Sequence, residues 1–262
     1  MDETIVQARP TPEQIKKDMQ GMYDPIGQWM LQDAEQGDKM ILTRTQPARY
    51  WMEHKLDTTF RLGRFSKTDH LLEIGCTAGH YTFMLAEQGY HVTGTDISAE
   101  SIKAAQAVGR RAGLNLAEFM QADAEDMRGI ADETFDGAFS FSTLRYVPNP
   151  VRAMHEIRRV LKPGGRAVVD FPNKYCPWFE FLKFLAGGER HIHDHTYSAA
   201  EVRKMMQEAG FVNVESKTII FFAKQFPGAL TPLYKGVDWL FERTPGLNYF
   251  AGIVMCKGEK AA

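Results

Sequence analysis

Two glycines and two aspartates stand where a nucleoside could be held. Gly75 and Gly79 flank a short turn after a buried apolar run, and glycine lets a backbone approach a ligand closely with positive φ. Gly79 also opens a helical segment, whose free N–H groups can hold a carboxylate. Asp96 closes the next strand-like run, where an acid can accept hydrogen bonds from both ribose hydroxyls, and Asp123 closes a third, within reach of an adenine amino group.

Two phosphate-binding motifs are excluded at this turn. A dinucleotide fingerprint starting at Gly75 needs glycines at positions 77 and 80, which hold Thr77 and His80. A P-loop needs Gly-Lys-Ser/Thr, which does not follow. The sequence therefore predicts a site for a nucleoside without a polyphosphate.

The elements that must position these residues alternate along the chain. Such alternation predicts βαβ units and a parallel sheet covered on both faces. We expect strands at 70–74, 90–95, 117–121, 135–141 and 166–171, with helices at 79–88, 98–112 and 150–161. A helix at 198–207 and two strand-like runs follow, at 212–223 and 248–256, separated by a helical 230–241.

The chain before this alternation has a helical texture. Thr11 and Pro12 are typical of a helix start, and we expect breaks at Gly21, Pro25, Gly37 and Pro47. We therefore divide the chain into a helical extension or cap, 1–62, and a domain, 63–262, with a substrate-side insertion at 173–195. The extension could be a lid, the surface of a homodimer, or both.

Five motifs in order resemble those of the class I S-adenosylmethionine-dependent methyltransferases. They are Glu73-x-Gly75-x-x-x-Gly79, TGTDIS at 93–98, QADA at 121–124, FDGAFS at 135–140 and RVLKPGG at 159–165. One departure is Thr77, which replaces the middle glycine of the first motif. The resemblance implies an α/β, doubly wound Rossmann-like fold with a seven-stranded sheet whose last strand is antiparallel. It also implies S-adenosyl-L-methionine as cofactor.

Site residues follow from the resemblance, motif by motif. Glu73 would lie near the methionine amino group or its loop, and Cys76, which could be read as a nucleophile, lies inside the cofactor turn. Arg145 and Tyr146 follow the fourth strand, where a surface role at a helix start is as well supported as a contact with substrate. The cofactor-binding residues expected are Glu73, Gly75, Cys76, Gly79, Asp96, Ile97, Asp123, Ala124 and Ser140.

Three alternating histidines, His191, His193 and His195, offer a general base. In an extended strand all three would project from one face, as a base or a metal site requires, although a solvated loop is the favoured interpretation. As a base for methyl transfer His195 comes first, because it is nearest the following helix, with His193 and Tyr146 as the other catalytic candidates. We expect no metal.

The insertion is rich in aromatic residues, which could pack on the sheet, cover an apolar acceptor or lie on a membrane surface, although the segment lacks the basic polar face of a membrane-surface helix. The family usually places substrate-binding insertions at this point, which favours the second interpretation. With Arg145, the substrate contacts expected are Tyr175, Trp178 and Phe179. All four tryptophans of the chain lie outside 63–172, in the parts where the family varies with substrate.

The composition of the chain limits the kinds of partner that it can bind. The 262 residues carry 31 Lys+Arg against 33 Asp+Glu, without the basic excess of a protein that binds nucleic acid. Three cysteines without framework spacing, a polar N-terminus and no apolar run of membrane-spanning length predict a cytoplasmic protein without a transmembrane segment. We expect a small-molecule or lipid-like acceptor, methylated on oxygen. The alternatives are a carbon or nitrogen atom, or a non-catalytic cofactor-binding module.

Overall fold

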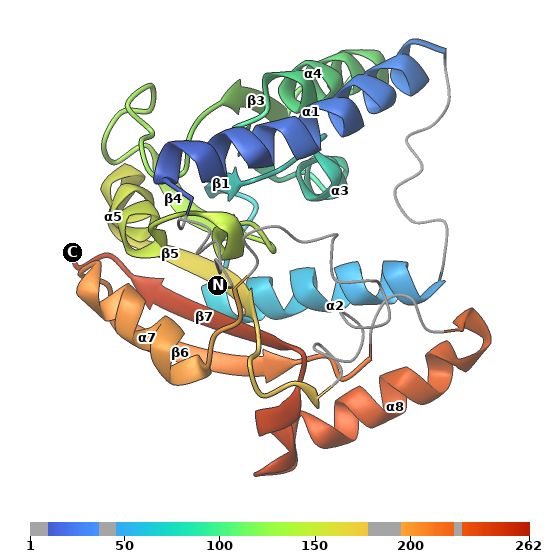
Figure 1. The fold of residues 1–262 in the computed structure, drawn as a ribbon, viewed down its shortest axis with the longest axis vertical. Helices are drawn as coiled ribbons and strands as arrows, with labels where there is room; N and C mark the ends of the chain where they lie inside the picture. The colour runs from blue at the N-terminus through green and yellow to red at the C-terminus, as the bar shows by residue number, and fades with distance from the viewer. Residues whose placement is uncertain (1–9, 37–45, 178–194, 223–226) are drawn as a thin grey trace, which may run out of the picture.

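Seven strands form one sheet in the order β3-β2-β1-β4-β5-β7-β6 (Figure 1). The computed structural model describes residues 10–36, 46–177, 195–222 and 227–262. The first five strands are parallel, and β7 runs antiparallel to both of its neighbours, which confirms the expected fold class. The strands are β1 His70–Ile74, β2 His91–Asp96, β3 Ala117–Gln121, β4 Phe135–Ser140, β5 Leu161–Pro172, β6 Val212–Ile219 and β7 Ile253–Glu259.

The bounds of the closing pair differ from the prediction. β6 ends at Ile219 because Ile220 adopts a left-handed φ of 64°, which takes the chain out of the ladder. β7 begins at Ile253, and the apolar residues before it form the 3-10 turn η3, Leu247–Phe250. An apolar run alone does not distinguish a strand from such a turn.

Helices cover both faces of the sheet. They are α3 His80–Glu87, α4 Ala99–Ala112, α5 Pro150–Val160, α7 Ala199–Glu208 and α8 Thr231–Phe241, with 3-10 turns η1 Leu144–Tyr146 and η2 Gly228–Leu230. Ser98 caps α4 through the Ser101 N–H, as its position predicts. Adjacent residues of β7 divide between two apolar clusters: Val254 packs with α5 and α7, whereas Met255 packs with α2 and α3.

Two helices precede the sheet, α1 Pro12–Gln36 and α2 Gln46–Gly63. The predicted breaks at Gly21 and Pro25 are wrong, because α1 continues through both residues and lies along α4 (Figure 1). At the crossing, a Cβ on Gly27 would come within 2.4 Å of the Ser101 backbone nitrogen. This packing outweighs the local helix-breaking tendency. Pro47 lies in the first turn of α2, where proline is tolerated.

No helix in the described part of the chain is long and apolar enough to cross a membrane. The three cysteines are buried and form no disulfide.

Candidate functional site

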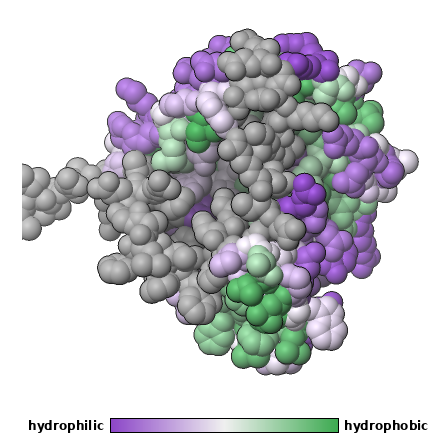
Figure 2. Space-filling view, turned by 90° about the vertical axis from the view of Figure 1, so that its right-hand side faces the viewer, coloured by the Kyte–Doolittle hydropathy of each residue, from purple (hydrophilic) through white to green (hydrophobic). Residues whose placement is uncertain are grey.

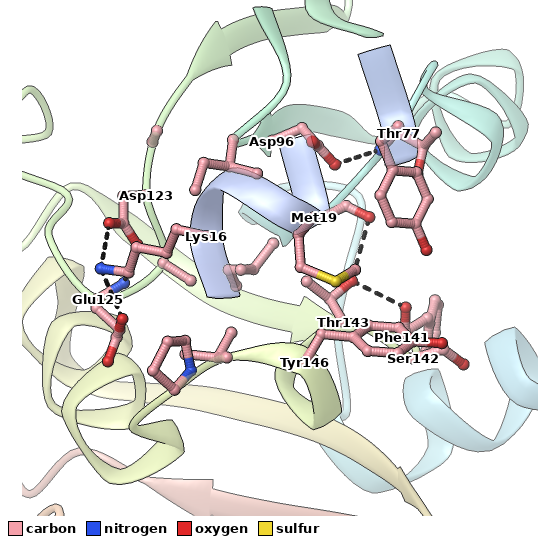
Figure 3. Close-up of a pocket in the computed structure, with 18 residues that line it drawn as sticks. Lys16, Met19, Thr77, Asp96, Asp123, Glu125, Phe141, Ser142, Thr143 and Tyr146 are labelled. Atoms are coloured by element: carbon pink, nitrogen blue, oxygen red, sulfur yellow. Dashed lines mark hydrogen bonds and ion pairs between the residues drawn. The ribbon is translucent and has the colours of Figure 1, made fainter. Parts of the chain in front are cut away.

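A cavity of about 240 Å³ lies beyond the carboxyl ends of β1 to β4, closed on one side by α1 (Figure 3). Ligands of doubly wound sheets bind at this edge. Its wall combines segments from several elements. From α1 come Lys16, Met19 and Tyr23. From the last residues of β1 and β2 and the turns after them come Ile74, Gly75, Thr77, Asp96 and Ile97. From the segments after β3 and β4 come Ala122, Asp123, Ala124, Glu125, Phe141, Ser142, Thr143, Tyr146, Val147 and Pro148.

The turn after β1 requires residues with left-handed backbone. Gly75 has a φ of 77°, and a Cβ there would come within 2.0 Å of the Thr143 hydroxyl oxygen. Thr77, at the position where the resembled family has a glycine, takes the same left-handed region with a φ of 50°. The departure in sequence is therefore accommodated without a change of backbone conformation.

Asp96 is the central carboxylate of the cavity. It is only 8% exposed, and its two oxygens accept hydrogen bonds from the backbone N–H groups of Thr77 and Ser98, each at 2.9 Å. Burial raises the pKa of Asp96. Each carboxylate oxygen can accept a further hydrogen bond. Asp96 can therefore accept further hydrogen bonds inside the cavity, and its contact with a ribose stays a prediction.

Asp123 lies on the cavity wall, but it is paired. The Lys16 Nζ lies 2.6 Å from the Asp123 Oδ2 and 2.6 Å from the Glu125 Oε2 (Figure 3). Although burial lowers the pKa of Lys16, its hydrogen bonds to the two carboxylates raise it overall. Sequence reasoning missed Lys16, because a lysine in an amphipathic helix gives no sign of a partner 107 residues away.

Two tyrosines line the cavity, Tyr23 from α1 and Tyr146 from η1. Burial raises the pKa of Tyr23 to about 12 and also raises that of Tyr146. Both phenols therefore stay protonated at neutral pH and can donate a hydrogen bond. Tyr146 lines the cavity as a hydrogen-bond donor, and its catalytic role stays a prediction.

The predicted cofactor residues separate into two groups. Gly75, Asp96, Ile97, Asp123 and Ala124 line the cavity, whereas Glu73, Cys76, Gly79 and Ser140 lie behind it. Buried Glu73 accepts a hydrogen bond from the Thr82 hydroxyl at 2.6 Å. The Ser140 hydroxyl donates to the Ile74 carbonyl at 3.0 Å, so both groups support the turn.

Among the described residues, those predicted to contact substrate or to act as a base do not line the cavity, with the exception of Tyr146. Arg145 adjoins it without lining it, and burial lowers the pKa of its guanidinium. Exposed Tyr175 stacks on Tyr249, with ring centroids 4.4 Å apart, and exposed His195 contacts the ring of Tyr197. His191, His193, Trp178 and Phe179 lie outside the described residues. The roles of the insertion therefore stay predictions.

A buried ion pair that sequence analysis did not predict supports the cavity wall after β4. The Lys55 Nζ, from α2, lies 2.5 Å from the Asp170 Oδ2 and donates to the Ser142 hydroxyl at 3.1 Å. Asp170 also accepts the Ser142 backbone N–H. The Lys55 ammonium lies 4.7 Å from the centre of the Phe141 ring, whose residue lines the cavity.

Among the described residues, one group has the spacing of metal ligands: His70, His91 and Glu118. It lies at the amino ends of β1 to β3, away from the cavity. The two imidazoles are stacked with centroids 3.8 Å apart, and they hydrogen-bond Thr93 and Glu118. This group therefore takes no part in the cavity.

Comparisons with known proteins agree with the fold. A methyltransferase-domain family model matches residues 72–169. An S-adenosyl-L-methionine-dependent Diels-Alderase, iccD of Talaromyces variabilis, is 32% identical over 64% of this chain and 60% of that protein. A ubiquinone biosynthesis O-methyltransferase of Aeromonas salmonicida is 27% identical over 57% of this chain and 65% of that protein. The chain thus matches less than two thirds of the length of these relatives.

A solved structure matches nearly the whole chain. The [4+2]-cyclase SpnF superposes with a TM-score of 0.64 and 21% identity, covering 97% of this chain and 98% of that one. At this identity the likeness concerns the fold, which includes the helices before the sheet.

Proposed function

Because the chain belongs to the class I S-adenosylmethionine-dependent methyltransferase family, we propose that it transfers the methyl group of S-adenosyl-L-methionine to a small, largely apolar or aromatic metabolite. The observation that carries the proposal is Asp96, a buried carboxylate that faces a cavity at the carboxyl edge of the sheet. The left-handed turn at Gly75 and Thr77 would lie against the methionine part, Asp96 would hold the ribose, and Ile97 and Asp123 would lie near the adenine.

The bound cofactor supplies an electrophilic methyl group on a sulfonium. What this chain contributes is alignment of the acceptor and exclusion of water. Met19 and Tyr23 of α1 close the cavity opposite Phe141 and give it an apolar and aromatic wall. Such a wall favours a flat, poorly hydrated acceptor over a charged one.

Oxygen is the accepting atom that we propose, in keeping with the O-methyltransferase among the relatives. No histidine lines the described part of the cavity, and Tyr23 and Tyr146 are held protonated. A base from the insertion, His195 first, is thus part of the proposal. Carbon and nitrogen acceptors, which need no base of comparable strength, are the alternatives.

A second candidate is cyclisation of a bound metabolite without methyl transfer. It is favoured by the 32% identity to a Diels-Alderase and is compatible with a cavity that offers no base among its described lining residues. In such a reaction the chain would only have to hold the substrate in a reactive conformation. A homodimer and a cytoplasmic location belong to the proposal as well.

One experiment separates the candidates. The protein is incubated with methyl-labelled S-adenosyl-L-methionine and a metabolite extract, and products are followed by label and by mass. Methyl transfer predicts a labelled product and one equivalent of S-adenosylhomocysteine, both lost in Asp96→Ala. Cyclisation predicts a product of unchanged mass without label. Absence of cofactor binding in the wild type would refute methyl transfer, and absence of both kinds of product would refute both candidates.

A further inference from the structure

One helix of the molecule is oriented against the usual rule that surface helices bury apolar and expose polar side chains. Asp238 of α8 and Glu242, the residue that follows the helix, are buried acids, whereas Leu233 is 59% exposed and Trp239 is 60% exposed. The outward face of α8 is therefore apolar. Figure 2 shows apolar side chains gathered at the lower end of the molecule, where α8 lies in Figure 1.

Polar contacts hold α8 in this orientation from the inside. The Asp238 carboxylate accepts hydrogen bonds from the Tyr50 hydroxyl and the Phe221 N–H, each at 2.7 Å. Glu242 lies 2.6 Å from the His54 Nε2 and accepts the Ile220 N–H at 3.1 Å. If the apolar face turned inward, these carboxylates would lose their buried hydrogen-bond partners, which costs free energy. The outward orientation of the apolar face is therefore stable.

The apolar face continues into η3. We name the outward residues of 230–250 the α8–η3 surface. Its large apolar members are Leu230, Leu233, Trp239, Leu240, Leu247, Tyr249 and Phe250. Tyr249 stacks on exposed Tyr175, which extends the surface to the segment after β5. Apolar patches of this kind are uncommon on monomers and mark interaction sites.

The charges on the α8–η3 surface have one sign. Its exposed charged residues are Lys235 and Arg243, since the only two acids of 230–250 are turned inward. The Arg243 guanidinium lies 4.9 Å from the centre of the Trp239 ring, so a cation and an amphipathic aromatic group lie together. Tryptophan, tyrosine and basic residues around leucines are the composition that binds at the interface of an anionic bilayer.

We propose that the α8–η3 surface docks this protein on a membrane surface that contains anionic lipids. The inference goes beyond the proposed function, because it concerns a surface separate from the cavity and needs no reaction. A second copy of the chain is a poorer occupant. Two such faces meeting about a twofold axis would bring Lys235 and Arg243 of both copies together without an acid.

The test measures binding to lipid vesicles by flotation. We expect the wild type to float with vesicles of phosphatidylcholine and phosphatidylglycerol, to float much less with phosphatidylcholine alone, and to be released by high salt. The double variant Lys235→Gln/Arg243→Gln should bind the anionic vesicles roughly 30-fold more weakly, at the usual contribution of a basic residue near such a surface.

Two tryptophan variants supply the matched comparison. Trp239→Ser should weaken binding roughly tenfold, whereas Trp29→Ser, on α1 and 52% exposed, should leave it unchanged. Thermal denaturation and S-adenosylhomocysteine binding should be unaltered in Trp239→Ser, which separates loss of docking from misfolding and from failure of the proposed function.

Three results would overturn the proposal. One is no binding of the wild type to either vesicle, and another is equal binding to both with no effect of salt. The third is a wild-type dimer by analytical ultracentrifugation that Trp239→Ser converts to monomer, which would assign the surface to a second copy.

Discussion

The Lys55 ammonium of α2 lies 2.5 Å from the Asp170 carboxylate of β5, and both side chains are buried to within 1% of completely. The pair joins a helix that precedes the sheet to its central strands and holds Ser142, which has a left-handed φ of 56° at the cavity wall. A buried ion pair is costly to form and more costly to break on one side only.

Removing one partner of this ion pair should therefore lower the free energy of unfolding far more than removing both. We expect Lys55→Met to lower the free energy of unfolding by about 3–5 kcal/mol, because it leaves the Asp170 carboxylate buried without a cation. The double variant Lys55→Met/Asp170→Asn should recover most of this loss, since asparagine keeps an acceptor for the Ser142 N–H. Urea denaturation of both single variants and the double variant measures the coupling.

An exposed ion pair is the control for this double-mutant cycle. Lys103 and Glu100 on α4 lie 2.7 Å apart, with Lys103 largely exposed, and Lys103→Met should leave the stability nearly unchanged. Additive losses in the Lys55 and Asp170 variants would contradict the assignment of a coupled buried pair.

The ribose assignment predicts the behaviour of Asp96. Asp96→Ala should weaken S-adenosylhomocysteine binding by about 10- to 100-fold, the usual value of hydrogen bonds to a charged acceptor. Isothermal titration calorimetry measures this, with the exposed Asp57→Ala of α2 as control. If Asp96→Ala binds as tightly as the wild type, Asp96 does not hold the cofactor.

Local patterns were sufficient for the parts of the site that belong to one strand and its turn. The bounds of β1 and β3, the Ser98 cap and the cavity positions of Asp96 and Asp123 agree with the prediction. Each of these features depends on residues within a few positions of one another in the sequence. At that range the periodicity of apolar residues, the turn residues and the helix caps determine the local structure directly.

Contacts between distant segments could not be predicted in this way. Lys16 reaches Asp123, and Lys55 reaches Ser142, across 107 and 87 positions of sequence. A lysine in a helix has the same local pattern whether it is solvated or paired. The same reason explains the wrong helix breaks, because the contact of Gly27 with Ser101 that holds α1 against α4 is absent from the local sequence.

The packing of α1 on α4 can be tested with two glycines of the same helix. Gly27→Ala should lower the free energy of unfolding by about 1–3 kcal/mol, because its Cβ would meet the α4 backbone and force the helices apart. Gly21 has no atoms within 4 Å of such a Cβ, and Gly21→Ala should stabilise α1 by about 0.5–1 kcal/mol.

The same pair of variants reports on the cavity. Because α1 carries Lys16, Met19 and Tyr23, Gly27→Ala should also weaken S-adenosylhomocysteine binding, and Gly21→Ala should not. Thermal denaturation and calorimetry on both variants give the two readouts. Unchanged affinity in a destabilised Gly27→Ala would show that α1 does not contribute to binding.

One buried and one partly buried group beside the turn after β1 should make stability depend on pH in opposite directions. Burial raises the pKa of Glu73 from its ordinary value of 4.5 to about 7, so between these pH values the folded protein keeps a proton that the unfolded chain has lost. This stabilisation is complete below pH 4.5 and disappears as the pH rises to about 7, a loss of about 3 kcal/mol. Burial lowers the pKa of His80 to about 4, so its stabilisation is complete above pH 6.5 and is lost as the pH falls toward 4.

In the wild type the contributions of Glu73 and His80 to the pH dependence of stability oppose each other between pH 4.5 and 6.5. Glu73→Gln, whose amide oxygen can still accept the Thr82 hydroxyl, should change the pH dependence so that stability rises more steeply with pH across this range. His80→Asn should change it the other way, with stability falling more steeply. Urea denaturation at a series of pH values measures both curves. A Glu73→Gln curve parallel to that of the wild type would mean that Glu73 is ionised in the folded protein throughout.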